Sequence, residues 1–449
     1  MNGNFQHLQS QAGTSTIAFD GEPRFDSVSQ SEFCAANAPD GTSALRLVYL
    51  LSQYPAVSHT FFLNEIRELR SLGFTIDVAS INPPDCQNLS MHATELEEVD
   101  RTFYIKSKGA ASAIFIAVRT LLRRPGVFAR GLVAALRLGR WDLNATLYSI
   151  FYFVEALILG DWMRSRSLRH LHIHFCGPVA TVGMLASTAW GFPYSLTVHG
   201  PDEFYDVEKF YLRRKIEHAK FILCISNFCR SQLMRITAPE HWEKMHVVRL
   251  GVDPLLFCPM RRDGEPESAV EILCVGRLVP SKGQLMLLCA CDLLLTRGYS
   301  LRVRLVGAGP DRKILEAFAE HKRIPVFFEG AKNHEETRQL LARADIFALA
   351  SFAEGVPVAL MEAMAMQVAC VSTCVAGIPE LIRDGLDGLL VPASSADALA
   401  SAIQRLIEDL PLRRRLAVSG RKRVCELYKL SENVLSLARV FHQHLQESN

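Results

Sequence analysis

Residues 345–366 read DIFALASFAEGVPVALMEAMAM, an apolar run that leads through a short loop into an apolar helix. The run Asp345–Ala350 is typical of a buried strand. Pro357 suits the first helical position, where its missing N–H does no harm. The free N–H groups of Gly355 and Val356 would then point out of the helix N-terminus, where they can bind an anion or a hydroxyl group. This strand–loop–helix unit is the building block of a parallel sheet.

The same alternation of strand and helix continues on both sides of this segment. In the second half of the chain, strands are predicted at 271–275, 301–306, 326–329 and 368–372, and helices at about 283–296, after 310 and across 335–343. In the first half, a strand at 44–51, a turn at 52–58, a helix at 61–72 and a strand at 75–80 repeat the unit.

These patterns predict an α/β chain with two Rossmann-like, doubly wound domains that face a central cleft. Residues 1–43 are polar and predicted to be a disordered tail. The first domain is expected at 44–250, the second at 251–430, and a C-terminal helix at 431–449 that packs back on the first domain. A ligand is expected in the cleft, at the carboxyl ends of the strands.

Composition fits a protein with real cores and gives little sign of a partner. The chain has 449 residues, of which 49% are hydrophobic, and its net charge of +2 argues neither for nor against nucleic acid. The 12 cysteines are scattered and lack the spacing of a zinc site, so no metal is expected. We expect them to be buried thiols in a reducing compartment.

The start of the chain does not resemble a signal peptide. Residues 1–15 lack the basic start and apolar core of a signal peptide, so a cytoplasmic location is expected. The best membrane-span candidate is Leu147–Trp162, which is short for a span and contains Glu155. We interpret it as a buried core helix.

The loop 276–283, GRLVPSKG, follows a predicted strand and opens a helix. Gly276 allows a sharp turn, and Arg277 and Lys282 can both reach into the cleft, where two cations and a helix N-terminus would neutralise an anion. The alternative is a solvated turn with two surface cations.

Two glutamates frame the start of the helix described first. Glu354 lies in the loop at the mouth of the predicted cleft, and Glu362 lies in an otherwise apolar part of the helix. A carboxylate there needs a partner because burying it unpaired is costly, and a sugar diol would serve. The alternative is that Glu362 caps or pairs locally on an exposed face.

Taken together, these motifs resemble glycosyltransferase family 4, whose members have the GT-B fold. The resemblance covers Leu45 to the C-terminus. It rests on the E-x7-E spacing of Glu354 and Glu362, on Gly276-Arg277 and Lys282-Gly283, on the linker GVDPLLF at 251–257 and on AGIPE at 376–380.

The resemblance implies a role for each of these residues. Arg277 and Lys282 would bind the diphosphate of a UDP- or GDP-sugar donor, Glu354 would contact the donor sugar, and Glu362 would hold the ribose. Gly355, Val356 and Pro357 would line the sugar and phosphate site, and the base would lie near residues 330–333. Members of the family retain anomeric configuration without a metal or other cofactor, and the leaving phosphate helps to take the acceptor's proton.

The first domain adds a candidate and a departure. His199 follows the predicted strand Tyr194–Val198 and resembles the family's His-Gly loop, so it is the candidate for contacting the donor sugar near the reacting carbon; a histidine satisfied by local backbone is the alternative. A structural role is expected for His172–Phe175. Ser58-His59-Thr60-Phe61 resembles Ser-Glu-Thr-Phe of the subset that builds bacterial exopolysaccharides of the colanic-acid type, but His59 replaces the Glu.

A stretch rich in arginine and large apolar residues suggests where the protein binds its acceptor. Residues 101–141 contain no Asp or Glu, and six arginines from Arg119 to Arg140 alternate with large apolar residues. This pattern suits the inner face of the plasma membrane and a lipid-linked saccharide acceptor. A helix pair with a solvated basic face is the alternative, and a free saccharide acceptor remains open. No nucleic-acid motif accompanies these residues.

Two other functions remain open: a sugar-nucleotide epimerase or phosphorylase of the same fold, and a non-catalytic sugar-nucleotide-binding protein. The second would be expected to lack Glu354, Arg277 or Lys282, and all three are present. The donor base, the donor sugar, the linkage and the oligomeric state are not predicted.

Overall fold

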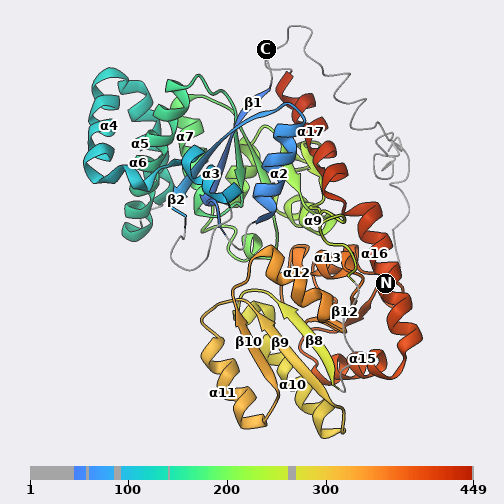
Figure 1. Ribbon diagram of the computed structural model, residues 1–449. Helices are drawn as coiled ribbons and strands as arrows, with labels where there is room; N and C mark the ends of the chain where they lie inside the picture. The colour runs from blue at the N-terminus through green and yellow to red at the C-terminus, as the bar shows by residue number, and fades with distance from the viewer. Residues whose placement is uncertain (1–44, 57–59, 85–92, 140–141, 261–268, 447–449) are drawn as a thin grey trace, which may run out of the picture. The chain divides into compact units, whose positions relative to one another are not determined.

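The computed structural model describes residues 45–56, 60–84, 93–139, 142–260 and 269–446, all within one compact unit, Pro39–Asn449 (Figure 1). The predicted tail 1–43, His59 and the polar stretch 261–268 lie outside the described residues.

Among the described residues, the first sheet has seven parallel strands in the order β3-β2-β1-β4-β5-β6-β7. The strand order reverses between β1 and β4, which is where open α/β sheets bind ligands at the carboxyl ends of their strands. The elements are β1 Arg46–Gln53, α2 Thr60–Ser71, β2 Thr75–Asn82, α3 Ala93–Arg101, β3 Phe103–Tyr104, α4 Gly109–Arg123, α5 Pro125–Gly139, α6 Leu143–Ser165, β4 Leu171–His174, α7 Pro178–Trp190, β5 Tyr194–Val198, α8 Leu212–His218, β6 Ile222–Cys224, α9 Asn227–Ile236 and β7 Met245–Val247.

The second sheet has six described parallel strands in the order β10-β9-β8-β11-β12-β13. It repeats the strand order of the first sheet, with the reversal between β8 and β11. The elements are β8 Val270–Val275, α10 Gln284–Thr296, β9 Leu301–Val306, α11 Arg312–Lys322, β10 Val326–Gly330, α12 His334–Arg343, β11 Ile346–Leu349, α13 Val358–Ala365, β12 Ala369–Thr373, α14 Ile378–Leu381, β13 Leu389–Val391, α15 Ala396–Glu408, α16 Leu410–Leu427 and α17 Leu430–Gln446.

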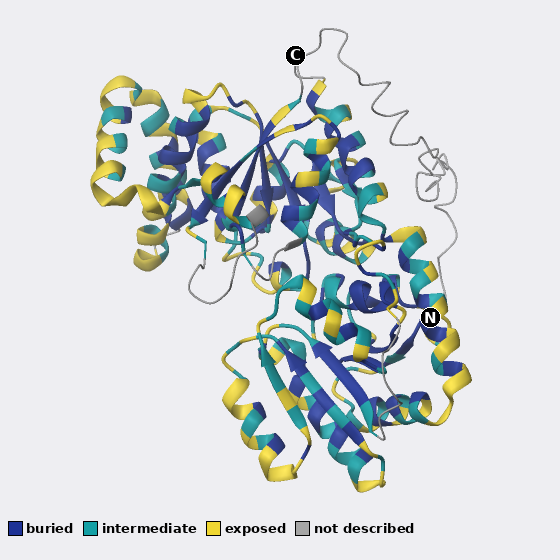
Figure 2. Cartoon of the chain, viewed as in Figure 1, coloured by how far each residue is buried: buried dark blue, intermediate teal, exposed yellow. Residues whose placement is uncertain are grey.

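The central strands are buried along their length, as expected when helices cover both faces of a parallel sheet (Figure 2). Burial on both faces explains why these strands are continuous apolar runs in the sequence and do not alternate between apolar and polar residues. The last helix, α17, packs against α2 of the first domain. Its Phe441 is fully buried and lies against the rings of Tyr49 and His172.

Two predicted helices differ from the structure. Helix α13 begins at Val358, one residue later than predicted, because Pro357 has an extended ψ of 120° and serves as the N-cap. The apolar segment Leu147–Trp162 belongs to a longer helix, α6, which is long and apolar enough to cross a membrane by length and composition. The second half of α6 is largely buried in the first domain, whereas Leu143 and Tyr148 near its start are exposed.

Candidate functional site

The ends of β8 and β11 bring two of the predicted residues into direct contact. Lys282 Nζ lies 2.6 Å from Glu354 Oε1, and the Ser351 hydroxyl donates to the same oxygen at 2.7 Å. Glu354 is buried, while Lys282 is partly exposed. An ammonium group has three N–H donors, so Lys282 can hold Glu354 and still bind a phosphate oxygen.

Backbone contacts fix this pair in place. The Phe352 N–H donates to the Ser281 carbonyl at 2.8 Å, which ties the two loops together. Gly283 has a φ of +64°, and a Cβ there would overlap the Ala350 carbonyl oxygen. Glycine is therefore required at 283 both for its conformation and for the close approach of the two loops.

Arg277 lies on the same loop as Lys282, with an exposed side chain. The Gln284 side chain donates to the Arg277 carbonyl at 2.8 Å and holds the loop against the start of α10. The structure therefore places both predicted cations on one loop, but only Lys282 is in contact with Glu354.

Glu362 is one turn into α13 and is buried, with 6% of its surface exposed. Burial disfavours its charged form and raises its pKa to about 8. His334 Nδ1, at the start of α12, lies 3.5 Å from its Oε1. Because residues 330–333 directly precede His334, the loop predicted to meet the base lies beside Glu362.

The loop after β5 lies against residues 351–357, the loop that follows β11 and that we call the donor loop. A Cβ at Gly200 would be 2.9 Å from Gly355 Cα, and a Cβ at Gly355 would overlap the His199 carbonyl oxygen. A Cβ at Gly377 would likewise overlap the Gly355 carbonyl oxygen. Three loops therefore meet backbone to backbone, and His199 stands next to the Glu354–Gly355 segment.

His199 is buried and held by groups that the sequence did not reveal. Its Nε2 lies 3.1 Å from His174 Nδ1, and the Glu203 carboxylate accepts hydrogen bonds from the N–H groups of His199 and Gly200. Burial raises the pKa of Glu203 to about 6 while those hydrogen bonds oppose the rise. A structural role was expected for His174, which ends β4, and its contact with His199 depends on the pairing of β4 with β5.

Glu380 in the AGIPE segment is a further residue whose contacts the sequence left open. Its carboxylate accepts hydrogen bonds from the N–H groups of Asn227 at 2.9 Å and Phe228 at 2.7 Å, at the start of α9. A carboxylate at a helix N-terminus is stabilised by the helix dipole. Glu380 thus links the second-domain loop that carries Gly377 to a helix of the first domain.

A cavity of about 700 Å³ opens in the first domain beside this site. It lies between the ends of β1 and β2 and helices α6 and α7, and is mostly apolar, with Lys106, Glu155 and Asn82 as polar groups. Phe175 lines it, and the centroid of the Phe175 ring is 4.4 Å from that of His199. Phe175 has a φ of +67°, a conformation that large side chains rarely adopt and that often marks functional sites.

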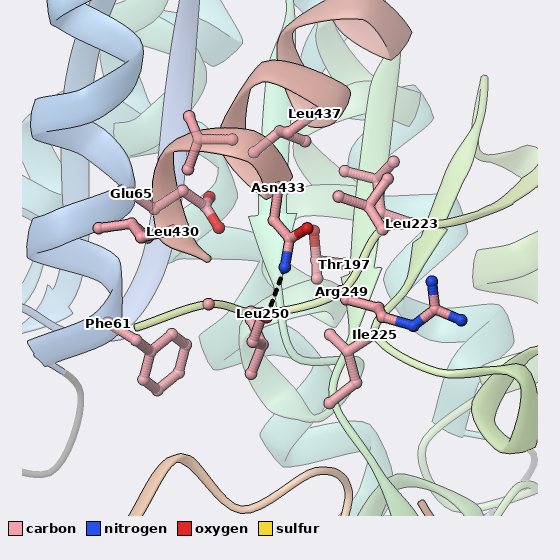
Figure 3. Close-up of a pocket in the computed structure, with 13 residues that line it drawn as sticks. Phe61, Glu65, Thr197, Leu223, Ile225, Arg249, Leu250, Leu430, Asn433 and Leu437 are labelled. Atoms are coloured by element: carbon pink, nitrogen blue, oxygen red, sulfur yellow. Dashed lines mark hydrogen bonds between the residues drawn. The ribbon is translucent and has the colours of Figure 1, made fainter. Parts of the chain in front are cut away.

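A second, smaller cavity of about 20 Å³ lies between α2, the segment 248–251 and α17. Figure 3 shows Glu65 of α2 on one side of it and, on the other, Asn433, whose amide donates to the Leu250 carbonyl at 2.9 Å. Glu65 is nearly buried, and burial raises its pKa to about 7.

Two family models together match most of the chain. Residues 59–255 match Glycosyltransferase Family 4 and residues 260–423 match Glycosyl transferases group 1. The putative colanic acid biosynthesis glycosyltransferase WcaL of Escherichia coli K12 is 29% identical over 381 residues, 80% of this chain and 90% of WcaL. The amylovoran biosynthesis glycosyltransferase AmsK of Erwinia amylovora is 27% identical over 376 residues, 81% of this chain and 90% of AmsK.

The fold is also shared with a solved structure. The crystal structure of Anabaena HepE in complex with UDP and glucose matches with a TM-score of 0.65 at 16% identity, over 88% of this chain and 98% of HepE. Two parallel sheets with repeated strand order, matched family models in both halves and this structural likeness agree: the chain is a glycosyltransferase with the GT-B fold, built from a Glycosyltransferase Family 4 domain followed by a Glycosyl transferases group 1 domain.

Proposed function

We propose that the protein transfers a hexose from a UDP- or GDP-sugar to a saccharide or lipid-linked saccharide, with retention of anomeric configuration and without a metal, in the synthesis of an exopolysaccharide. The observation that carries the proposal is the Lys282–Glu354 pair beside the His199 loop. The names of WcaL and AmsK support the exopolysaccharide, and the UDP and glucose bound to HepE support the donor class.

The donor chemistry follows from the charges at the second-domain loops. As the bond from the anomeric carbon to the phosphate oxygen breaks, negative charge grows on that oxygen, and Lys282 and Arg277 are the cations available to stabilise it. Glu354 is a hydrogen-bond acceptor for a sugar hydroxyl, because an ionised carboxylate only accepts. In same-face attack the acceptor oxygen bonds to the anomeric carbon while the leaving phosphate takes the acceptor's proton.

The first domain supplies a place for the acceptor. The cavity of about 700 Å³ reaches Phe175, whose ring lies beside His199, so an acceptor there would end close to the donor sugar. Helices α4 and α5, with Arg124 between them, carry five arginines and no acid and expose Phe115 and Leu122, which supports a peripheral location on an anionic membrane.

The first test is a thermal-shift screen with UDP, GDP, ADP and their common sugar conjugates, with EDTA present. One nucleotide is expected to raise the unfolding temperature clearly, which would fix the donor base and the absence of a metal requirement for binding. No rise with any of them would count against the proposed donor class.

Activity assays with the donor so identified then test the residues. Lys282→Ala should lower kcat/KM by about 10²–10³-fold and weaken nucleotide binding, because it removes the positive charge that stabilises the developing anion. Glu354→Gln should lower kcat more than nucleotide affinity, because it acts on the sugar. Lys322→Ala is the matched control, since Lys322 also pairs with an acid, Asp292, at 2.9 Å, but away from these loops. Wild-type activity in Lys282→Ala or Glu354→Gln would refute that residue's role.

A further inference from the structure

A row of four buried polar side chains connects the interior of the first domain to the donor loop. The Tyr49 hydroxyl lies 2.8 Å from Glu65 Oε1, the same oxygen lies 3.5 Å from His174 Nε2, and His174 Nδ1 lies 3.1 Å from His199 Nε2. Tyr49 and His174 are fully buried, and Glu65 and His199 have at most 9% of their surface exposed. The four come from β1, α2, the end of β4 and the residue after β5.

We propose that Glu65 and His174 are positioning residues that determine which ring nitrogen of His199 carries its proton. The proposal rests on the proposed function only in that His199 is the first-domain side chain next to the donor loop. Through the backbone contact of His199 and Gly200 with Gly355, the ring that Glu65 and His174 orient is held beside the sugar site.

The direction of each hydrogen bond follows from the chemistry of the groups. Burial and the Glu65 charge raise the pKa of Tyr49 well above its usual range, so its hydroxyl stays a donor to Glu65. An ionised carboxylate accepts only, so a neutral His174 ring carries its proton on Nε2, which faces that carboxylate. At 3.5 Å this contact is longer than an ordinary hydrogen bond, and Glu65 acts through its charge.

The preference of His174 is passed on to His199. With its proton on Nε2, His174 has a lone pair on Nδ1, so His199 must donate to it from Nε2. His199 Nδ1 is then the acceptor nitrogen. A protonated Glu65 removes this constraint because a neutral carboxyl group can donate as well as accept, and His199 then adopts both tautomers.

The Glu65 carboxyl group gains or loses its proton within the pH range of ordinary activity assays. Burial raises its pKa to about 7, and the Tyr49 hydrogen bond opposes the rise. Glu65 also lines the cavity of about 20 Å³, which is large enough for one water molecule beside its carboxyl group. Among the described residues, the titratable and charged groups near the row include His172, whose pKa burial lowers well below its usual range, Glu203, which binds the His199 backbone, and Arg249, which lines the small cavity together with Glu65. Activity should therefore fall as the pH drops through about 7.

Histidine-selective ¹⁵N NMR of the full chain tests this directly, with His199 assigned by its loss in His199→Asn. In the wild type, His199 is expected to show one tautomer, protonated at Nε2, above about pH 7.5 and two tautomers below about pH 6.5. Glu65→Gln is expected to show both tautomers at every pH. It should also lower kcat by at least about 10-fold, with the donor KM within about twofold of the wild type, because the misdirected group is a hydrogen-bond partner at the reacting centre.

Two further variants keep the test decisive. Tyr49→Phe removes the hydrogen bond that lowers the Glu65 pKa, so the inflection of kcat against pH should move up by about one unit. His170→Gln is the matched control: His170 is equally buried and bonds to Ser195 at 2.8 Å, and the substitution should leave kcat and the tautomers of His199 unchanged.

The outcomes separate this proposal from the proposed function. A single tautomer with wild-type kcat in Glu65→Gln would overturn it. If that variant fails to fold, an unmoved inflection in Tyr49→Phe would do the same. If no nucleotide sugar is turned over but the tautomer of His199 switches near pH 7, the positioning role holds and the transferase proposal fails.

Discussion

Glu362 gives a pH test for the ribose contact. Its raised pKa of about 8 means that the folded protein holds it protonated at neutral pH. A ribose diol donates two hydrogen bonds and so favours the ionised form. Nucleotide affinity should rise by up to about 10-fold per pH unit between pH 6 and 8 and then level off, with proton release on binding below pH 8. Calorimetry in buffers of different ionisation enthalpy measures both quantities.

The controls for this prediction lie on α13 and α12. Glu362→Gln should bind the nucleotide with an affinity that does not change over this pH range. Glu336→Gln should keep the wild-type slope because Glu336 is partly exposed and the hydrogen bond that it accepts from the Asn333 N–H lowers its pKa. A wild type that binds at pH 7 without releasing protons would contradict the ribose contact. The same raised pKa means that Glu362 costs stability progressively as the pH rises from about 4.5 to 8.

Single residues were predictable where one loop carries the chemistry. Lys282 and Glu354 were both candidates because each follows a strand and opens a helix, but their ion pair was not, since 72 residues separate them. Glu65 gave no local signal, and His174 was expected to have only a structural role. Their relation to His199 depends on how β4 pairs with β5 and where α2 packs, which the order of residues along the chain does not state.

At the scale of the element, the turn before α10 can be tested with two glycines that share a left-handed backbone. Gly283→Ala adds a Cβ that would overlap the Ala350 carbonyl oxygen, whereas a Cβ at Gly298 would meet nothing within 4 Å. Gly298→Ala should cost about 1 kcal/mol from backbone strain alone. Gly283→Ala should cost at least about 2 kcal/mol more and weaken nucleotide binding, because it pushes Lys282 away from Glu354.

Chemical unfolding of both variants, followed by nucleotide titration, measures the two effects. Equal losses of unfolding free energy, or a Gly283→Ala protein that binds as tightly as the wild type, would show that the loop contact does not hold the cation in place. The comparison is matched because both positions have a positive φ, +64° and +88°.

Elements were predicted best where a single apolar run or helical period marks them. The second-domain strands and helices that were given ranges, from β8 to β12, lie within about one or two residues of them, as expected for buried runs bounded by glycine and proline, whereas β13 and helices α14 to α16 were not predicted. The start of α13 was wrong by one residue, because proline is compatible with the N-cap as well as with the first helical turn. The full length of α6 was missed because polar residues such as Asn144 and Arg164 hide its ends.

At the scale of the whole molecule, the exposed face of α4 and α5 predicts binding to anionic vesicles. The full chain should sediment with vesicles that contain about 30% phosphatidylglycerol, less so with neutral ones, and less in high salt because the attraction is screened. Arg123→Glu with Arg137→Glu should weaken binding by about 10-fold or more, since each arginine near the surface contributes about 1 kcal/mol. Both side chains are exposed.

The matched control is Arg414→Glu with Arg415→Glu, which reverses two exposed charges on α16 of the second domain. It should bind vesicles like the wild type. Equal weakening by the two double variants would point to net charge rather than to this face, and no binding by the wild type would remove the membrane from the proposed function.

The plan of two doubly wound sheets was predictable because alternating strand and helix patterns allow few topologies. The predicted site residues after β8 and β11, and His174 at the end of β4, lie at the reversals of strand order where such sheets bind ligands, and His199 lies one strand further along, after β5. Sequence patterns could not predict that loops from different sheets lie in contact, because no periodicity of apolar residues specifies such a contact.

Gly200, Gly355 and Gly377 meet where a single methyl group on any of them would collide with the main chain of a neighbour. Each position leaves no room for a side chain, so replacing any one of them alone would force the loops to shift. Among related sequences the three positions should therefore vary together or not at all. A side chain at any one of them would mark a relative whose loops have separated, and such a relative is expected to keep its two sheets while losing the site that lies between them.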